Sequence, residues 1–200
     1  MKIIDVQQGT PEWISARLGL PTASCFDKIV DTSGKPSKQR RKYLFQLAGE
    51  RVVCSKDAEQ FKSGAMQRGT ELEPEARSLY ELITGAKVRQ VGFCITEGDA
   101  VYGASPDGLV DDDGSVQIKC PLIPAHVSYL LDGGLPSEYF QQVQGELLVT
   151  GRKWCDFFSY YPGLKPLLVR VEPDADFHKV LKAELELFCL QLDDAVSQLR

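Results

Sequence analysis

The hydrophobic positions along the chain follow two spacings, one typical of helices and the other of strands. Apolar residues recur at helical spacing in segments that predict helices over residues 10–19, 22–30, 43–53, 74–83, 136–150 and 174–199. Short apolar runs bounded by turn-forming residues predict strands over residues 93–95, 101–104, 109–110, 116–119, 154–160 and 167–171. This order of elements predicts an α/β fold in which helices flank a mixed central β-sheet.

Local signals at the ends of the segments sharpen the pattern. Thr10 followed by Pro11 is typical of a helix start, with Thr as the N-cap and Pro at the first helical position. An acidic cluster at residues 71–75 precedes the helix predicted from Pro74. After Pro121 the pattern is less regular, and no element is predicted before residue 136.

Composition limits the class of protein. The chain has 200 residues, of which 43% are hydrophobic and 26% charged, so it is long enough for one buried core and has no mark of disorder. Without an internal repeat or linker, a single domain over residues 1–200 is expected. No apolar run has the length of a membrane span, and the first residues lack the features of a signal peptide. We therefore expect a cytoplasmic protein with no membrane partner.

The charge balance argues against a protein that coats nucleic acid, because the net charge is −5. It leaves a nuclease open, since a metal-binding cleft concentrates carboxylates. The most positive segment, residues 31–42, is a candidate contact for DNA phosphates, and a solvated loop is the equal alternative. Its basic residues are Lys35, Lys38, Arg40, Arg41 and Lys42.

The cysteines and histidines carry no metal-site pattern. Six cysteines are scattered without a close pair, which predicts reduced, mostly buried thiols. His126 and His178 have no partners at ligand spacing, so each is expected to be structural or on the surface. Packing is likewise favoured over base stacking for Trp154, Tyr160 and Tyr161.

The stretch from Ser105 to Pro121 predicts a β-hairpin that contains candidate catalytic residues. Asp107 precedes the first strand, and an acidic, Gly-containing turn leads to the second. On that second strand Gln117 and Lys119 point to the same face. A carboxylate, a second oxygen ligand and a lysine are able to hold a hard divalent cation and a water beside a phosphodiester. Position 117 should then be Glu or Asp, and it is Gln.

Several further blocks occur together with this hairpin. In order along the chain they are Trp13, Ala16–Gly19 and Thr22–Ser24; Arg68–Glu73 with Ala76–Arg77; Ala104–Leu109; Ile118–Pro121; and Gln142–Gln144. Together they resemble the phage lambda exonuclease family, the viral-type alkaline exonucleases within the restriction-endonuclease-like nucleases. Each block alone is a weak or moderate signal, whereas five in register are a strong one. The resemblance implies a restriction-endonuclease-like core.

The resemblance also implies the roles of the hairpin residues. Asp107, Gln117 and the backbone carbonyl of Ile118 would hold Mg²⁺, with Mn²⁺ as an alternative ion, and Lys119 would orient or activate the attacking water. Glu73 matches a further acidic position, next to a second metal or its water; a helix N-terminal carboxylate is the alternative. Gln142 matches a glutamine near the catalytic water, and an ordinary polar residue on a helix is the alternative.

A second set of residues matches the family's contacts with the DNA end. Arg17, Ser24 and Ser105 match a pocket for the 5′-phosphate, for which a guanidinium and hydroxyl donors are suited. Without the resemblance, a surface arginine and two capping serines would be the better interpretation. Met66 matches an apolar side chain that separates bases at the fork, and a core methionine is the equal alternative.

As a function, the resemblance implies a homotrimeric ring around double-stranded DNA. It would digest the 5′-phosphorylated strand processively to mononucleotides and leave a 3′ overhang for a single-strand annealing protein, in a bacterial or prophage-infected host. The five basic residues of the loop would then face the central channel. Two alternatives stay open: a structure-specific endonuclease of the same fold, and a noncatalytic module that binds DNA ends for recombination.

Gln117 departs from the family pattern, because an amide keeps one oxygen ligand but removes a full negative charge. Three explanations compete: a deliberate change that traps a substrate complex, a natural residue in a site that is still active, and a degenerate nuclease that only binds DNA ends. The swap is isosteric with Glu and the other motif residues are in place, which favours an inactivated variant.

Overall fold

The computed structural model describes residues 1–55 and 64–200, apart from the side chains of Ala65 and Met66. Its central sheet has five strands in the order β2-β5-β6-β7-β8. Their bounds are Val88–Arg89, Gly108–Val110, Gly114–Lys119, Trp154–Ser159 and Leu167–Val171. Strands β6 and β7 are parallel and every other pair is antiparallel. The predicted α/β fold with a mixed central sheet is therefore confirmed.

A second, smaller sheet has the order β1-β3-β4. It consists of β1 (Lys2–Ile4), β3 (Phe93–Ile95) and β4 (Gly103–Ala104), all antiparallel. The sequence predicted no strand at the N-terminus, since three residues are too few to show a period. Its last strand, β4, leads directly into the hairpin of β5 and β6.

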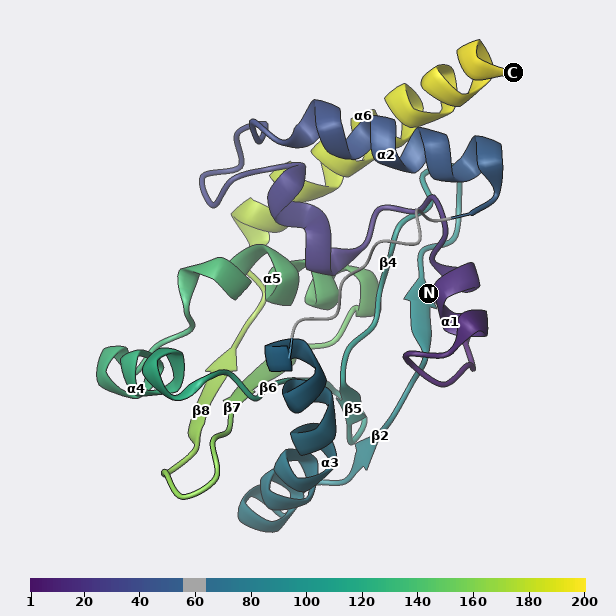
Figure 1. The fold of residues 1–200 in the computed structure, drawn as a ribbon. Helices are drawn as coiled ribbons and strands as arrows, with labels where there is room; N and C mark the ends of the chain where they lie inside the picture. Colours follow the sequence, from purple (N-terminus) through teal and green to yellow (C-terminus); the bar gives the residue numbers. More distant parts are fainter. Residues whose placement is uncertain (56–63) are drawn as a thin grey trace.

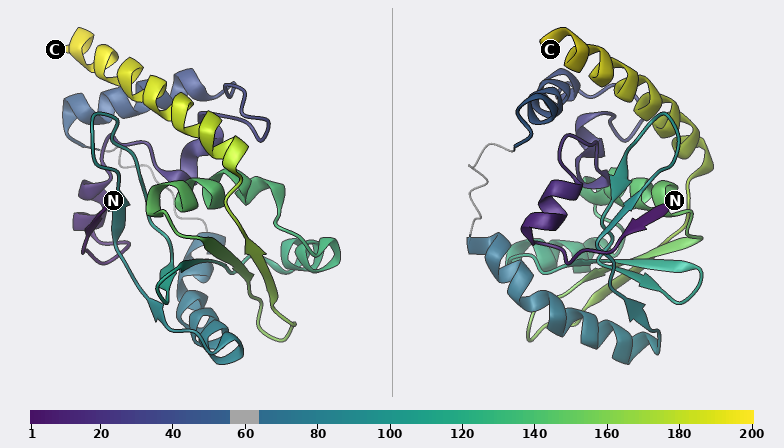
Figure 2. Two further views of the ribbon diagram at one scale, coloured as in Figure 1. Left: turned by 180° about the vertical axis from the view of Figure 1, so that it is seen from behind. Right: turned by 90° about the vertical axis from the view of Figure 1, so that its right-hand side faces the viewer.

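Helices cover both faces of the central sheet and pack on one another at one end (Figure 1). They are α1 (Pro11–Ala16), α2 (Arg40–Val53), α3 (Gly64–Thr84), α4 (Ile123–Asp132), α5 (Phe140–Thr150) and α6 (Ala175–Leu199), with short 3-10 segments η1 (Ala23–Lys28) and η2 (Ser137–Tyr139). Helices α2 and α6 run side by side at the end of the molecule opposite α3 (Figure 2). No helix among the described residues combines the length and the apolar character needed to cross a bilayer.

Alternation along β7 assigns the two faces. Phe158 packs in one cluster with Tyr80 of α3, whereas Phe157 packs in another with Val143 of α5. In the parallel register Gln117 lies beside Phe157, and Lys119 beside Ser159. Gln117 and Lys119 therefore share the face that α5 covers, as their spacing predicted.

Several predicted elements differ in extent. Thr10 caps α1 as expected, its hydroxyl accepting from the Trp13 N–H. The helix predicted from Pro74 is the second half of α3, which continues through this proline; Pro is favoured at helix starts, so the sequence placed the start there. The segment predicted over residues 22–30 forms only the 3-10 turn η1.

Helix α4 was missed altogether. Its apolar residues Ile123, Val127 and Leu131 are exposed, so they do not form the single buried stripe by which an amphipathic helix is recognised. Pro124 near its start and the left-handed Gly133 after its end are the signals that were available.

The structure also tests the predictions for the cysteines, for His126 and for Tyr160. All six cysteines are free, as expected, but only Cys94, Cys155 and Cys189 are buried, whereas most of the six were expected to be. His126 is buried and structural, with Nδ1 2.8 Å from Ser159 Oγ and Nε2 3.0 Å from the Lys165 carbonyl. Tyr160 is part of the core cluster against α3.

Candidate active site

The hairpin predicted at Ser105 to Pro121 is present. Strands β5 and β6 pair with Gly108 opposite Val116 and Val110 opposite Gly114. Both glycines are required by close approach: a Cβ on Gly108 would lie 2.1 Å from Val88 Cγ1, and one on Gly114 would lie 2.2 Å from the Trp154 ring. The hairpin is thus fixed against its neighbours, and so is Asp107 at its start.

Asp107 is held by two donors from the second strand. Gln117 Nε2 and the backbone N–H of Ile118 both donate to Asp107 Oδ2, the latter at 2.7 Å. Gln117 Oε1 in turn accepts from Gln142 Nε2 of α5 at 2.9 Å. The structure therefore brings together Asp107, Gln117, Ile118 and Gln142, as the sequence predicted.

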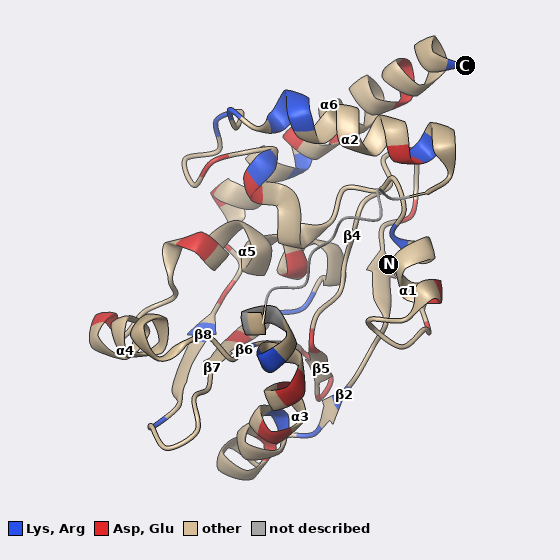
Figure 3. Ribbon diagram, viewed as in Figure 1, with Lys and Arg blue, Asp and Glu red and all other residues tan. Residues whose placement is uncertain are grey.

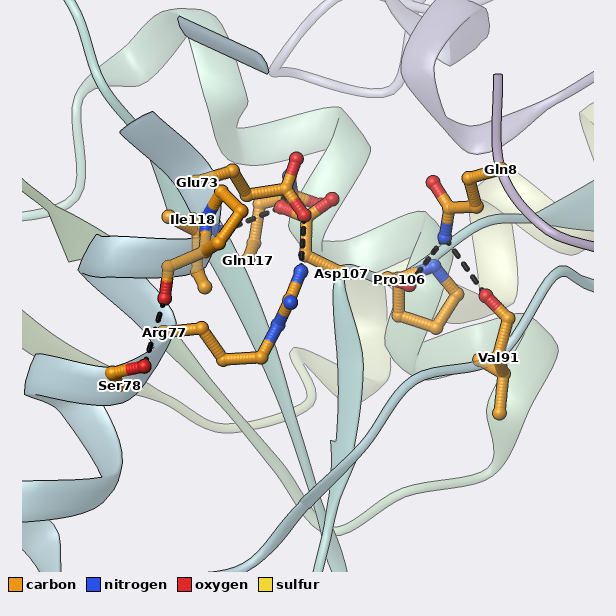
Figure 4. A network of polar contacts seen from close by, with 10 residues as sticks. Gln8, Glu73, Arg77, Ser78, Val91, Pro106, Asp107, Gln117 and Ile118 are labelled. Atoms are coloured by element: carbon orange, nitrogen blue, oxygen red, sulfur yellow. Dashed lines mark hydrogen bonds and ion pairs between the residues drawn. The ribbon is translucent and has the colours of Figure 1, made fainter. Parts of the chain in front are cut away.

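Glu73 joins this group from α3. Its carboxylate pairs with Arg77 one turn later, and it lies toward Asp107 and Gln117 in the view of Figure 4. All three line an open cleft of about 410 Å³, together with Lys119 and Tyr139. Because α3 starts well before Glu73, this residue is inside the helix, and the alternative of an N-terminal dipole contact is wrong. A larger cavity of about 700 Å³ beside α6 contains none of the predicted site residues.

Electrostatics in the cleft favour a cation. Burial raises the pKa of Asp107 to about 6; the ammonium of Lys119 opposes this effect, and the carboxylate of Glu73 adds to it. The Lys119 ammonium lies 5.1 Å from the centre of the Tyr139 ring. A positive charge added beside Asp107 and Glu73 would stabilise the charged form of the buried Asp107 carboxylate. Buried acids with shifted pKa values are often found at functional sites.

The oxygen donors suit a hard divalent cation, with one qualification at position 117. Asp107 and the Ile118 carbonyl supply oxygens, but Gln117 turns its nitrogen, not its oxygen, toward Asp107. Two carboxylates in these positions would repel each other and need a cation between them, whereas the amide satisfies Asp107 directly. Among the described residues no group of three Asp, Glu, His or Cys side chains is placed to hold a metal. A turn of the Gln117 amide by 180° would offer an oxygen to a cation but give up its hydrogen bonds with Asp107 and Gln142, so the donor set fits only a weakly bound cation.

A second pocket adjoins the cleft. Arg17 Nη1 donates to Ser105 Oγ at 2.9 Å, and Nη2 lies 3.4 Å from both Ser24 Oγ and Thr22 Oγ1. The guanidinium stacks on Trp13, at 4.0 Å from the ring centre. Burial lowers the pKa of Arg17, and no carboxylate in the described part of the chain lies within ion-pair distance of it. This half-buried cation, which has no carboxylate within ion-pair distance in the described part of the chain and is surrounded by hydroxyls, is suited to bind an anion.

Two contributors to this pocket escaped the sequence reasoning. Trp13 Nε1 donates to Ser105 Oγ at 3.0 Å, so it positions the serine as well as the arginine. Thr22 adds a third hydroxyl. Both belong to the blocks that carried the resemblance, which was the only signal for them.

A side chain from the N-terminal segment links the pocket to the cleft. Gln8 Nε2 donates to the carbonyls of Val91 and Pro106, each at 2.9 Å (Figure 4). Pro106 lies between Ser105 of the pocket and Asp107 of the cleft. The segment that leads into α1 is thereby tied to the residue next to Asp107.

The predicted DNA contacts lie elsewhere or outside the described residues. Arg40 begins α2, where its guanidinium pairs with Glu184 of α6 at 2.6 Å, while Lys35, Lys38, Arg41 and Lys42 are exposed. This basic loop lies at the α2–α6 end, away from α3 (Figure 3). The Met66 side chain lies outside the described residues.

A parallel β6–β7 pair inside an otherwise antiparallel sheet, with an acid, an amide and a lysine on its hairpin, defines a nuclease of restriction-endonuclease-like fold. Residues 12–153 match the YqaJ-like viral recombinase domain. The chain belongs to this family, the group of lambda-type alkaline exonucleases that its sequence resembles.

Solved structures agree with this assignment. The crystal structure of an alkaline exonuclease (LHK-Exo) from Laribacter hongkongensis is 36% identical, with a TM-score of 0.87, over 95% of this chain and 96% of that chain. The same exonuclease in complex with dAMP gives a TM-score of 0.86 at the same identity and coverage. A phage-related exonuclease from Haemophilus somnus 129PT, 16% identical over 90% of this chain and 96% of that chain with a TM-score of 0.68, shares the fold. No curated protein matches the chain.

Proposed function

We propose that this protein is a Mg²⁺-dependent exonuclease on double-stranded DNA that hydrolyses the 5′-phosphorylated strand in the 5′-to-3′ direction. The products are mononucleotides and a 3′ overhang, which a single-strand annealing protein uses in recombination. One enzyme that supports the proposal is the similar alkaline exonuclease whose structure has been solved with dAMP.

The observation that carries the proposal is the adjacency of the two pockets. Ser105 contacts the Arg17 guanidinium, and Asp107 stands two residues later in the same segment. Two extended residues span about 7 Å, a distance comparable to that between neighbouring phosphates of one DNA strand. A terminal phosphate held at Arg17 therefore places the next phosphodiester beside Asp107 and Lys119.

Each residue then has a role that its position supports. Arg17, Ser24 and Ser105 bind the terminal phosphate through charge-assisted hydrogen bonds. Asp107, residue 117 and the Ile118 carbonyl hold the cation, with Glu73 beside them. The cation supplies charge neutralisation at the phosphate and lowers the pKa of the attacking water. Lys119 holds the water and balances developing negative charge, and Gln142 positions residue 117.

Gln117 attenuates this activity. Its amide donates to Asp107, so a cation has to displace that hydrogen bond and gains no charge from residue 117. The same contact favours a second function, a noncatalytic module that binds 5′-phosphorylated ends, in which the cleft stays closed by the amide.

The test compares this chain with its Gln117→Glu form on linear duplex in Mg²⁺. We expect the Glu form to release 5′-mononucleotides from 5′-phosphorylated ends and the Gln form to be slower by about 100-fold or more, the range typical for loss of a catalytic electrostatic contact. An inert Glu form that still binds phosphorylated ends would establish the end-binding module. Cutting of closed circular duplex would establish an endonuclease.

The assembly is a ring-shaped homotrimer with the basic loop facing its channel. Light scattering should then give three times the 22.2 kDa chain mass. A monomer in solution would remove the geometric basis for processive digestion.

A further inference from the structure

Glu146 is a buried acid that the proposed reaction leaves without a role. It lies one turn after Gln142 on α5 and is 1% exposed. Oε1 accepts from Gln142 Nε2 at 3.0 Å, while Oε2 has no partner among the described residues. Burying a carboxylate with one oxygen unsatisfied is costly, so the position calls for a functional explanation.

The charged groups around Glu146 belong to both pockets. They are Asp107 and Lys119 of the cleft and Arg17 of the phosphate pocket. Burial, followed by the repulsion of Asp107, raises the pKa of Glu146 to about 8, while Lys119 and Arg17 favour its charged form. A divalent cation beside Asp107 would add positive charge at the same place and relieve the repulsion between the two acids.

Gln142 connects Glu146 with residue 117. Its single Nε2 donates both to Glu146 Oε1 and to Gln117 Oε1. The carboxylate of Glu146 therefore stands one amide away from the position where the family pattern requires a carboxylate. It holds the amide of Gln142, which without a cation keeps the Gln117 nitrogen turned toward Asp107.

We propose that Glu146 is a positioning residue of the cation site: a divalent cation bound beside Asp107 draws Glu146 into its charged form, and the buried carboxylate then supplies the negative charge that Gln117 lacks. The inference rests on the proposed function, because it takes the Asp107 cleft as the cation site. It explains why an acid is kept in the core beside Asp107, where two like charges otherwise repel. In a medium of low effective dielectric, this charge acts on a nearby divalent cation without direct contact.

The test is a double-mutant cycle of Glu146→Gln and Gln117→Glu, read out as Mn²⁺ affinity of the full chain without DNA. Free Mn²⁺ is measured by electron paramagnetic resonance. In the Gln117 chain, Glu146→Gln should lower the affinity about tenfold or more. With Glu at 117, the same change should lower it by less than about threefold, since residue 117 then provides the charge.

Glu50→Gln is the matched control. Glu50 is 6% exposed and accepts from the Gly19 N–H at 3.0 Å, but it is not among the charged groups that act on Asp107 or Glu146. It should leave Mn²⁺ affinity unchanged in both backgrounds. If Glu146→Gln does not fold, as judged by thermal unfolding without cation, Glu146→Met removes the charge at similar volume.

Three results overturn the proposal: an equal loss of affinity in both backgrounds, no loss in either, or no Mn²⁺ binding by the Gln117 chain at millimolar concentrations. Failure of the proposed nuclease function has a different signature, because the Gln117→Glu protein would then bind Mn²⁺ and leave DNA intact.

Discussion

Replacing Arg17 by Ala should remove the distinction between phosphorylated and unphosphorylated DNA ends. The guanidinium directs Nη1 and Nη2 at the hydroxyls of Ser105, Ser24 and Thr22, and a phosphate in this pocket would take two of its donors. A hydrogen bond to a charged group contributes about 1.5–3 kcal/mol. Two such bonds amount to about 3–6 kcal/mol, which corresponds to a preference of about 10² to 10⁴ for the 5′-phosphate.

The assay measures binding of two linear duplexes, one with 5′-phosphates and one with 5′-hydroxyls, in the absence of divalent cations. The intact chain should prefer the phosphate, Arg17→Lys should retain part of the preference because it keeps charge without the planar fork, and Arg17→Ala should lose it. Arg17 also stacks on Trp13, so thermal unfolding of each variant is needed beside the binding data.

Arg40→Ala is the control, since Arg40 is likewise partly buried but pairs with Glu184 at the α2–α6 end. It should leave the preference unchanged. If Arg17→Ala weakens binding of both duplexes by the same factor, the guanidinium contributes only general attraction and the terminal-phosphate pocket is refuted.

Three further predictions concern pH, packing and salt. The native chain keeps a proton on Glu146 up to a pKa of about 8, whereas the unfolded chain releases it near 4.5, so stability should fall as pH rises from about 5 to 8. In urea unfolding, the free energy of unfolding of Glu146→Gln should depend less on pH than that of the native chain. An unchanged pH dependence would mean that this acid titrates normally. Gly145→Ala should destabilise the chain by about 1–3 kcal/mol, because its Cβ would lie 2.4 Å from the Phe26 ring. An unchanged unfolding midpoint would show that Phe26 and the segment η1 around it shift at little cost. Neutralising Lys35, Lys38, Arg41 and Lys42 together should weaken DNA binding and flatten its salt dependence; if neither changes, the loop is merely solvated.

Most of the catalytic cleft could be read from the sequence because its residues are close together in one hairpin. Strand alternation alone placed Gln117 and Lys119 on one face, and the structure puts that face under α5. Glu73, Gln142 and Arg17 come from distant helices, and only the resemblance connected them with Asp107. Local patterns contain no information about which helix face meets which strand.

Glu146 shows what neither pattern nor resemblance reveals. In the sequence it follows Gln141, Gln142 and Gln144 on the same helix, where an exposed glutamate would fit equally well. Its burial, its unsatisfied oxygen and its neighbours depend on how α5 packs against η1, β4 and β7. A run of charged residues has the opposite effect, because it suggests a functional role for a residue that is structural. Arg40, part of the basic loop, pairs with Glu184 and stabilises the packing of α2 on α6.

If the protein acts as proposed, the Gln8 contact with Pro106 would set the length of the products. Since Ser105 and Asp107 flank this proline, the interval from the bound chain end to the scissile bond is a property of the protein backbone. A flexible connection between the two pockets would allow fragments of mixed size. In the proposed reaction, a segment held from both sides would allow one step, and the digestion of a long duplex would then proceed in units of a single nucleotide.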